Sequence, residues 1–222
     1  VQTCALPISH GIAVIGANIV SNGGDIELTG NGGLFSAGSP DTFNHGLHLD
    51  AATIDSGTGN ITANSNSFIG DGIRIQNGSI IRSTTGAIDL ETGGSDATIQ
   101  DSGSSVTTVD GSIQFTSNGV NLINNATVSS TGANASFVEL FANELLIDAS
   151  SNVTTVDGLL SLVGSASFVM EDGSFADAGQ GRLSICADST VAQISRLVTT
   201  NDTSAAIRIL SRGVVDAGSS GG

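Results

Sequence analysis

A short pattern of alternating apolar and polar residues recurs along most of the chain, with a period of about 24 residues. Each repeat contains three apolar segments in a fixed order, separated by Gly, Asn, Asp or Ser. The most regular segment is an apolar-x-apolar pair, and successive pairs start 35, 27, 25, 25, 22, 23 and 24 residues apart. These pairs are Ile26/Leu28, Ile61/Ala63, Ile88/Leu90, Ile113/Phe115, Val138/Leu140, Leu160/Leu162, Leu183/Ile185 and Ile207/Ile209. A period kept over so many copies favours a repeat architecture.

Two further sets of apolar positions precede these pairs. One set, often following Gly, is Ile12/Val14, Leu47/Leu49, Ile73/Ile75, Ile99 alone, Val120/Leu122, Leu145/Ile147, Phe168/Met170, Val191 and Val214. The other, 7 or 8 residues further on and usually followed by Ser or Thr two positions later, is Ile19, Ile54, Ile80, Val106, Val128, Val153, Phe175 and Val198. Alternation with a period of two is typical of strands with one buried face.

Three short strands and three corners per repeat describe one coil of a parallel β-helix. The sequence therefore predicts an all-β fold, a right-handed parallel β-helix (β-solenoid) of about 8–9 three-strand coils of about 24 residues. At roughly 4.8 Å per coil the rod would be roughly 40 Å long. A β-sandwich or an up-and-down barrel also has many short strands and stays the alternative, although neither predicts so regular a three-part period.

One insertion interrupts the period, at about residues 31–44. It contains Pro40, which cannot donate a hydrogen bond to a sheet, so we expect a loop that leaves the wall of the coil. Insertions in solenoids often carry binding surfaces, and Leu34, Phe35, Pro40 and Phe43 are the candidate partner contacts. A surface loop that tolerates extra residues at little cost in stability explains the same stretch.

Residues 1–9 differ in composition from the rest of the chain. VQTCALPI can be encoded by GTT CAG ACG TGT GCT CTT CCG ATC, which resembles the end of a sequencing adapter, and the next adapter base could open the codon of Ser9. We expect residues 1–9 to be non-native and adapter-derived, and residues 10–222 to form a single β-helix fragment.

Charge and composition exclude several classes of function. Six Arg, no Lys and 21 acidic residues give a formal net charge of −15, which disfavours binding to nucleic acid and to anionic membranes. No apolar run is long enough for membrane insertion. Outside residues 1–9 the only cysteine is Cys186, which we expect to be a small core residue rather than a nucleophile.

Ionisable residues give no strong indication of chemistry. His48 and Asp50 should share the outward face of one strand, with His45 at the corner, a set that could bind a metal or relay a proton. With no third ligand in the sequence, an ordinary solvated strand face is the favoured explanation, so no catalytic, cofactor or metal site is predicted.

Arginine and carboxylate residues are the other candidates, because β-helical polysaccharide lyases and hydrolases need such groups clustered over a cleft. Arg74 and Arg82 could meet Asp71 and Asp89 near one corner. The remaining acidic residues are scattered singly, so ordinary surface charge accounts for them as well.

The repeats GIAVIGANIVSNGGDIELTGNGG, HGLHLDAATIDSGTGNITANS and DGIRIQNGSIIRSTTGAIDLETGG resemble filamentous-haemagglutinin-like adhesins, the large β-helical exoproteins of bacteria with an outer membrane. The resemblance covers residues 10–222 and implies a non-enzymatic structural or adhesive stalk, secreted by a two-partner or autotransporter route. Its expected location is extracellular or on the cell surface, and its expected partners are host-cell, matrix or neighbouring-cell molecules. A β-helical carbohydrate-active enzyme and a surface-layer or matrix component remain alternatives. Open coil ends also predict end-to-end self-association.

Overall fold

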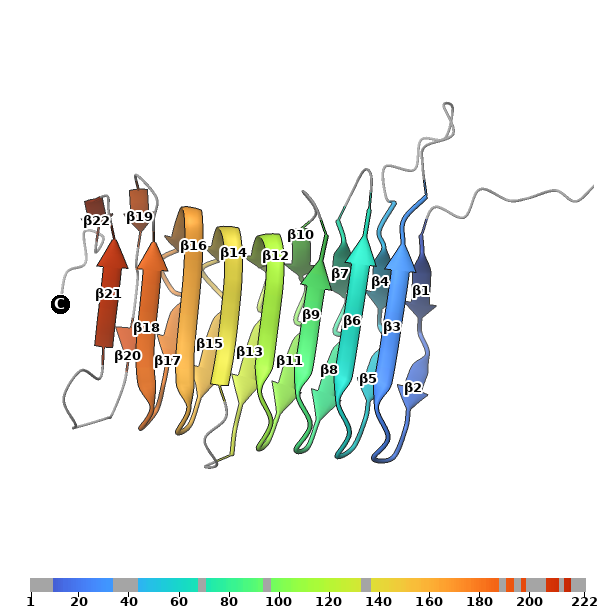
Figure 1. The fold of residues 1–222 in the computed structure, drawn as a ribbon. Coiled ribbons are helices and arrows are strands. Elements are labelled where there is room, and N and C mark those ends of the chain that lie inside the picture. Colours follow the sequence, from blue (N-terminus) through green and yellow to red (C-terminus); the bar gives the residue numbers. More distant parts are fainter. Residues whose placement is uncertain are drawn as a thin grey trace, which may run out of the picture.

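The structure is a computed structural model that describes residues 10–33, 44–67, 71–93, 97–132, 137–187, 191–193, 197–198, 207–211 and 214–216. These residues form 22 β-strands and no helix. Every strand pair among them is parallel. Each strand lies beside its counterpart one repeat away, so the chain forms stacked coils (Figure 1). The predicted all-β parallel solenoid is confirmed.

Each coil has up to three strands. Strands in the first position are β1 (Ile12–Ile15), β4 (Leu47–Asp50), β7 (Ile73–Gln76), β10 (Ala97–Gln100), β19 (Val191–Gln193) and β22 (Val214–Asp216). Strands in the second position are β2 (Asn18–Val20), β5 (Thr53–Asp55), β8 (Ile80–Ser83), β11 (Ser105–Thr108), β13 (Thr127–Ser130), β15 (Asn152–Thr155), β17 (Phe175–Asp177) and β20 (Leu197–Val198). Strands in the third position are β3 (Ile26–Asn31), β6 (Ile61–Asn66), β9 (Ile88–Thr92), β18 (Arg182–Ala187) and β21 (Ile207–Ser211). Three longer strands serve as the third strand of one coil and the first of the next: β12 (Ile113–Leu122), β14 (Phe137–Ile147) and β16 (Leu159–Met170).

The second-position strands form an 8-stranded sheet, and the first- and third-position strands belong to one 14-stranded sheet. The described strands therefore make eight coils, numbered here from the N-terminus, and β22 begins a ninth.

The third corner differs from the prediction in the middle of the chain. We expected three corners per coil, but β12, β14 and β16 pass through the third corner without a break in the strand. In β12 the two consecutive residues Gly119 and Val120 are both buried, which changes the face that later residues present to the core. Between β14 and β16 the register shifts after Ala142, because β16 has one extra residue between Gly164 and Ser167. An extra residue of this kind bends a strand while the ladder continues.

The interior consists of ladders of stacked aliphatic side chains. Ile88 pairs with Ile61 in the coil before and with Ile113 in the coil after, as the 27- and 25-residue spacings predict. All three side chains are at most 1% exposed. One coil alone could not bury these residues, so stacking supplies the core, at about 1.5–3 kcal/mol per buried aliphatic side chain before the entropy cost of ordering the chain.

In two of the second-position strands, the residue that faces the core is the one next to the predicted residue. Ile81, not Ile80, pairs with Ile54 and faces the core. Ala176, not Phe175, pairs with Val153 and is fully buried. Each pair contains two apolar neighbours, and a one-residue shift in register exchanges the two faces of a strand. The same shift applies to β20, where the partner of Ala176 is Leu197 rather than Val198.

Coil 4 has a polar interior in its first strand. Ile99 was predicted to face inward, but Thr98 and Gln100 occupy the ladder positions and are fully buried. The Gln100 side-chain amide donates to the backbone carbonyls of Ser104 and Thr127, both at 2.8 Å. Within the described part of the chain, the Thr98 hydroxyl has no hydrogen-bond partner.

Buried hydroxyl groups stabilise the corner after the second strand. Ser83 accepts a hydrogen bond from the Gly86 amide at 2.9 Å and donates to the Gly59 carbonyl of the preceding coil at 2.8 Å. Thr108 holds the Gly111 amide in the same way at 3.0 Å. This explains why Ser or Thr recurs two residues after the inward residue of the second strand, since backbone groups buried at a corner need partners.

Glycine is required where successive coils come closest. A Cβ atom on Gly86 would lie 1.9 Å from the Gly59 carbonyl oxygen, so no other residue fits there. At the first corner Asn77 and Gly78 have positive φ angles of 56° and 73°, a conformation that Asn and Gly adopt most readily.

The predicted insertion at residues 31–44 begins at the end of β3 and returns to the coil at Asn44, which is buried. The proposed contact residues Leu34, Phe35, Pro40 and Phe43 lie outside the described residues, as do residues 1–9.

Cys186 is not a core residue, contrary to the prediction. Its neighbours Leu183 and Ile185 face inward, so alternation places Cys186 on the outer face of β18, where it is half-buried. It pairs with Val163 of the coil before.

Candidate functional site

The densest group of ionisable side chains lies on the outer face of the first strands of coils 1 to 4. Leu47 and Leu49 point into the core, so His48 and Asp50 face outward together, as predicted. The register then places His48 beside Arg74 on β7. His45 lies next to Asp71, with its Nδ1 atom 3.3 Å from the carboxylate.

Coil stacking also brings a third histidine to this place. The centroid of the His10 ring lies 5.3 Å from that of His45 and 4.8 Å from that of His48, and the His45 and His48 centroids are 5.2 Å apart. The sequence reasoning missed His10, although the repeated His-Gly-apolar stretch at residues 10–12 and 45–47 could have indicated it. We call His10, His45 and His48 the histidine cluster.

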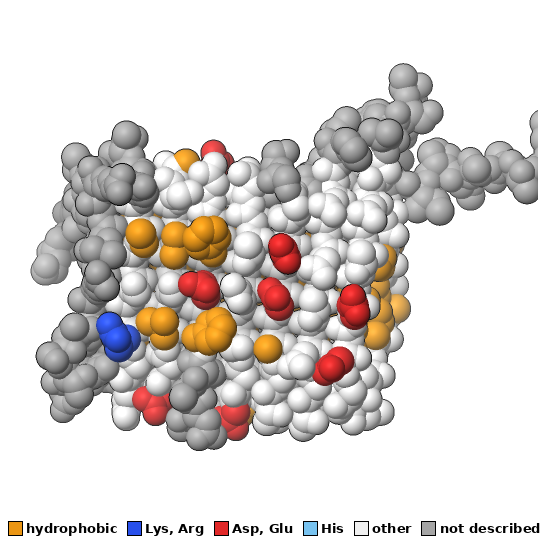
Figure 2. All heavy atoms as spheres, viewed as in Figure 1, with side chains coloured by type: hydrophobic (Ala, Val, Ile, Leu, Met, Phe, Trp, Pro, Cys, Tyr) orange, Lys and Arg blue, Asp and Glu red, His pale blue; other side chains and the backbone are white. Residues whose placement is uncertain are grey.

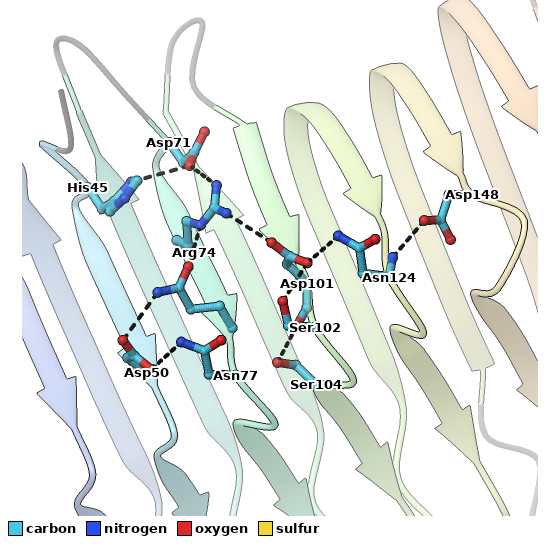
Figure 3. Close-up of polar contacts among 11 residues, drawn as sticks. His45, Asp50, Asp71, Arg74, Asn77, Asp101, Ser102, Ser104, Asn124 and Asp148 are labelled. Carbon is cyan, nitrogen blue, oxygen red and sulfur yellow. Dashed lines mark hydrogen bonds and ion pairs between the residues drawn. The ribbon is translucent and has the colours of Figure 1, made fainter.

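Arg74 is held between two carboxylates from different coils. Its guanidinium group lies 3.2 Å from Asp71 and 3.0 Å from Asp101, and its Nε donates to Gln76 at 2.9 Å (Figure 3). The predicted proximity of Arg74 and Asp71 is confirmed. Because Asp71 belongs to the third coil and Asp101 to the fourth, Arg74 links these two coils through its ion pairs.

Arg82 and Asp89 do not join this group. Arg82 forms an ion pair of 2.7 Å with Asp55 of the preceding coil, on the second sheet. Asp89 lies on the outer face of β9, where burial and the neighbouring Glu91 raise the pKa of its carboxyl group. The prediction that both arginines and both carboxylates meet at one corner is therefore wrong for Arg82 and Asp89.

Amide side chains continue the polar contacts along the coils. Asn77 and Gln76 donate to the two oxygens of Asp50 at 2.8 and 3.2 Å (Figure 3), and the bond from Asn77 is the main reason why the pKa of Asp50 is lowered. Further along the rod, Asn124 donates through its side chain to Asp101 and through its backbone amide to Asp148.

Asp148 closes this row of contacts at the first corner. Burial opposes ionisation of its carboxyl group, but hydrogen bonds from Asn124, Ser151 and Ser150 outweigh burial and lower its pKa. These bonds tie successive coils together with charged acceptors, which form stronger hydrogen bonds than neutral ones.

Metal coordination is not preformed in this group. Among the described residues, no set of three or more His, Cys, Asp or Glu side chains is arranged to hold a metal ion.

A second surface feature lies on the outer face of the third strands of coils 5 and 6. On β14 and β16 the outward side chains include Phe137, Phe141, Leu159 and Val163, and the first three are 37–47% exposed. Phe137 pairs with Leu159 and Phe141 with Val163, so they form two apolar rows with the Glu139–Ser161 pair between them. Figure 2 shows apolar side chains in two groups on this part of the face, amid acidic and uncharged polar residues. We call these four residues the apolar rows.

The apolar rows were missed because the sequence reasoning assigned only inward residues. The stretches FVELF and LLSLV place large apolar residues on both faces of a strand, and this departure from alternation is the pattern that could have indicated them.

The described part of the chain contains no helix that is long and apolar enough to cross a membrane. The stacked parallel coils define the chain as a β-solenoid repeat protein. Comparison with protein families, with curated proteins and with solved structures finds no match to it.

Proposed function

We propose that this chain is part of a structural and adhesive stalk of a secreted or surface-attached bacterial exoprotein. The observation that carries the proposal is the uninterrupted stacking of coils, with ladder residues at most 1% exposed from Leu47 to Ile185 in the third and first strands. Such a rod holds surfaces at a distance from its point of attachment. Its outward strand positions can vary because they contribute little to the buried ladders between coils.

The apolar rows support an adhesive role. Phe137, Phe141 and Leu159 are large apolar side chains in the middle of a sheet face whose other outward residues are mostly acidic or small and polar. Exposed apolar groups that are rimmed by polar residues are typical of contact surfaces. We propose that the apolar rows contact molecules of a host cell, of the matrix or of a neighbouring cell.

A β-helical carbohydrate-active enzyme is the second candidate function. The observation in its favour is the pair Asp89 and Glu91, which are two residues apart on the outer face of β9. The raised pKa of Asp89 is the property that a general acid needs, and glycoside hydrolysis uses paired carboxylates.

Binding to an array of glycans and to immobilised matrix proteins such as collagen and fibronectin tests the adhesive proposal. We expect the chain to bind at least one component, and Phe137→Ser/Phe141→Ser to reduce that binding at least about tenfold. Thr62→Ser, on the outer face of a distant coil, is the matched control. Absence of binding to every component, or equal binding by the double variant, would contradict the assignment of the apolar rows.

Incubation with pectin, alginate and related polysaccharides tests the enzyme candidate. If the chain is a non-enzymatic stalk, it should release neither reducing ends nor unsaturated products from these polysaccharides. If the chain forms such products and Asp89→Asn does not, the proposed stalk function is wrong and the enzyme function is supported.

A further inference from the structure

All three histidines of the chain belong to the histidine cluster. His10 precedes β1, whereas His45 and His48 come from the start of the next coil. The planes of the His10 and His45 rings differ by only 6°, so these two rings are stacked, and the His48 ring is tilted against both. Three imidazole groups, each of which becomes positively charged when it is protonated, thus lie in contact with one another.

The cluster lies where coil 1 is attached to coil 2. The Gly11 amide donates to the His45 carbonyl at 3.0 Å, and the Ile12 amide donates to the Gly46 carbonyl at 2.9 Å. His45 itself is only 2% exposed. A change of charge on these rings therefore acts directly on the contact between the first two coils.

The carboxylates around the histidine cluster already have other partners, so they offer little stabilisation to a positive charge on the rings. Asp71, before β7, lies beside His45 but also pairs with Arg74. Asp101 pairs with Arg74 as well, and Asp50 on β4 accepts bonds from Gln76 and Asn77. β1 has no ionisable residue, and on β3 only Glu27 is ionisable, at the end of the strand away from Asn31 and the cluster.

Protonation of the rings is accordingly unfavourable in the stacked structure. Burial, the other two histidines and Arg74 lower the pKa of His45 to about 4, against a weaker opposing effect of Asp71. Burial and His10 likewise lower the pKa of His48. Within the described residues neither ring nitrogen of His48 has a hydrogen-bond partner, so no acceptor is in place for a new N–H.

We propose that the histidine cluster is an acid-sensitive switch that releases coil 1 from coil 2. At neutral pH the uncharged rings stack and coil 1 covers the edge of β4, β5 and β6. In acid, positive rings repel one another and Arg74, and coil 1 separates. The newly exposed edge contains Leu47, Leu49 and Ile54, which are at most 1% exposed in the closed state, and it offers unpaired strand edges to another β-strand.

Hydrogen exchange of the whole chain, followed residue by residue by NMR, tests the switch. Between about pH 7 and about pH 4.5, most carboxylates stay ionised while histidines titrate. After correction for intrinsic rates, we expect amides of β1 to β3 to lose at least about tenfold in protection, while amides of β9 and β12 keep theirs. The loss should be reversible when the pH is raised.

Substitutions in the histidine cluster test whether the imidazole rings cause the loss of protection in coil 1. His45→Phe keeps an uncharged ring of similar shape and His48→Gln keeps a neutral polar group, so the double variant should retain the protection of coil 1 at about pH 4.5. Asp89→Asn is the matched control, because Asp89 is ionisable but distant from the cluster, and it should lose protection as the unmodified chain does. If His45→Phe does not fold, His48→Gln alone should lower the pH at which coil 1 opens.

Two outcomes would overturn the proposal. One is unchanged protection of coil 1 at about pH 4.5 while the NMR signals of the three histidines titrate near their ordinary value of about 6.5. The other is stoichiometric binding of Zn²⁺ by the unmodified chain that His48→Gln abolishes, which would make the cluster a metal site instead.

Discussion

The effect of a single side chain in this protein depends first on the face of the strand that it occupies. Ile88 and Asp89 are neighbours on β9, yet Ile88 is stacked in a ladder and Asp89 lies on the outer surface. Alternation let the sequence predict most inward residues. It failed where two apolar residues are adjacent, as at Ile80 and Ile81, because either could face the core and only the register with Ile54 decides.

Ile88→Asp should destabilise the chain by several kcal/mol, because it places an unpaired charge between Ile61 and Ile113. Thermal or denaturant unfolding monitored by circular dichroism measures the loss. Thr85→Asp, at an exposed position before the same strand, is the control and should change stability by less than about 0.5 kcal/mol. An unchanged melting temperature for Ile88→Asp would mean that the inward assignment is wrong.

Asp89→Asn should increase stability at neutral pH. The folded state raises the pKa of Asp89 above its ordinary value, so its contribution is favourable in acid and is lost as the pH rises through the folded pKa. Because Asp89 is partly solvated, the gain at pH 7 should be less than about 1 kcal/mol, and it should vanish near pH 3.

Asp55→Asn is the opposite case and provides the comparison. Bonds from the Gly57 amide and Arg82 lower the pKa of Asp55 despite partial desolvation, so this variant should be less stable at neutral pH. Denaturant unfolding of both variants at pH 7 and near pH 3 measures the two changes in stability. A loss of stability in Asp89→Asn at pH 7 would contradict the prediction.

At the scale of elements, coil 4 differs from its neighbours. The ladders that run through Ile73 and Ile75 continue in coil 4 as Thr98 and Gln100. The Gln100 amide nitrogen donates two hydrogen bonds, but among the described residues neither the Gln100 Oε1 atom nor the Thr98 hydroxyl has a partner. We therefore expect β10 to contribute less to the stability of the stack than the aliphatic strand β7 beside it.

Thr98→Val should stabilise the chain by about 1 kcal/mol, since it replaces a buried hydroxyl without a partner by a methyl group of similar size. Thr107→Val, on the half-exposed outer face of β11, is the matched control and should have little effect. Denaturant unfolding distinguishes the two. Destabilisation by Thr98→Val would indicate that a buried water or an alternative contact satisfies the hydroxyl.

In the whole molecule, the first described coil differs from the coils in the middle of the rod in how its strands are paired. Within the described residues, β1, β2 and β3 each pair on one side only. Leu28, Ile12 and Ile19 are less buried than their counterparts in later coils. Both features expose backbone groups and apolar side chains that strands in the middle of the rod conceal.

We expect end-to-end association that grows with concentration in light scattering, because heterologous contacts of this kind do not close. Leu28→Lys should reduce it by placing a charge at the open end. Glu27→Gln, whose side chain faces outward on the same strand, changes the net charge by the same amount and is the control. A chain that stays monomeric over a wide range of concentration would contradict this prediction.

The stacked parallel coil and most of its ladders could be predicted from the amino-acid sequence, because the inward alternation and the fixed period recur in every repeat. The sequence also indicated the corners, since Gly, Asn and Ser tolerate or stabilise their backbone conformations. The continuous bends in β12, β14 and β16, the polar interior at Thr98, and the contact of His10 with His45 and His48 became visible only in the folded chain. These features depend on register between segments more than 20 residues apart, and no single segment contains that information.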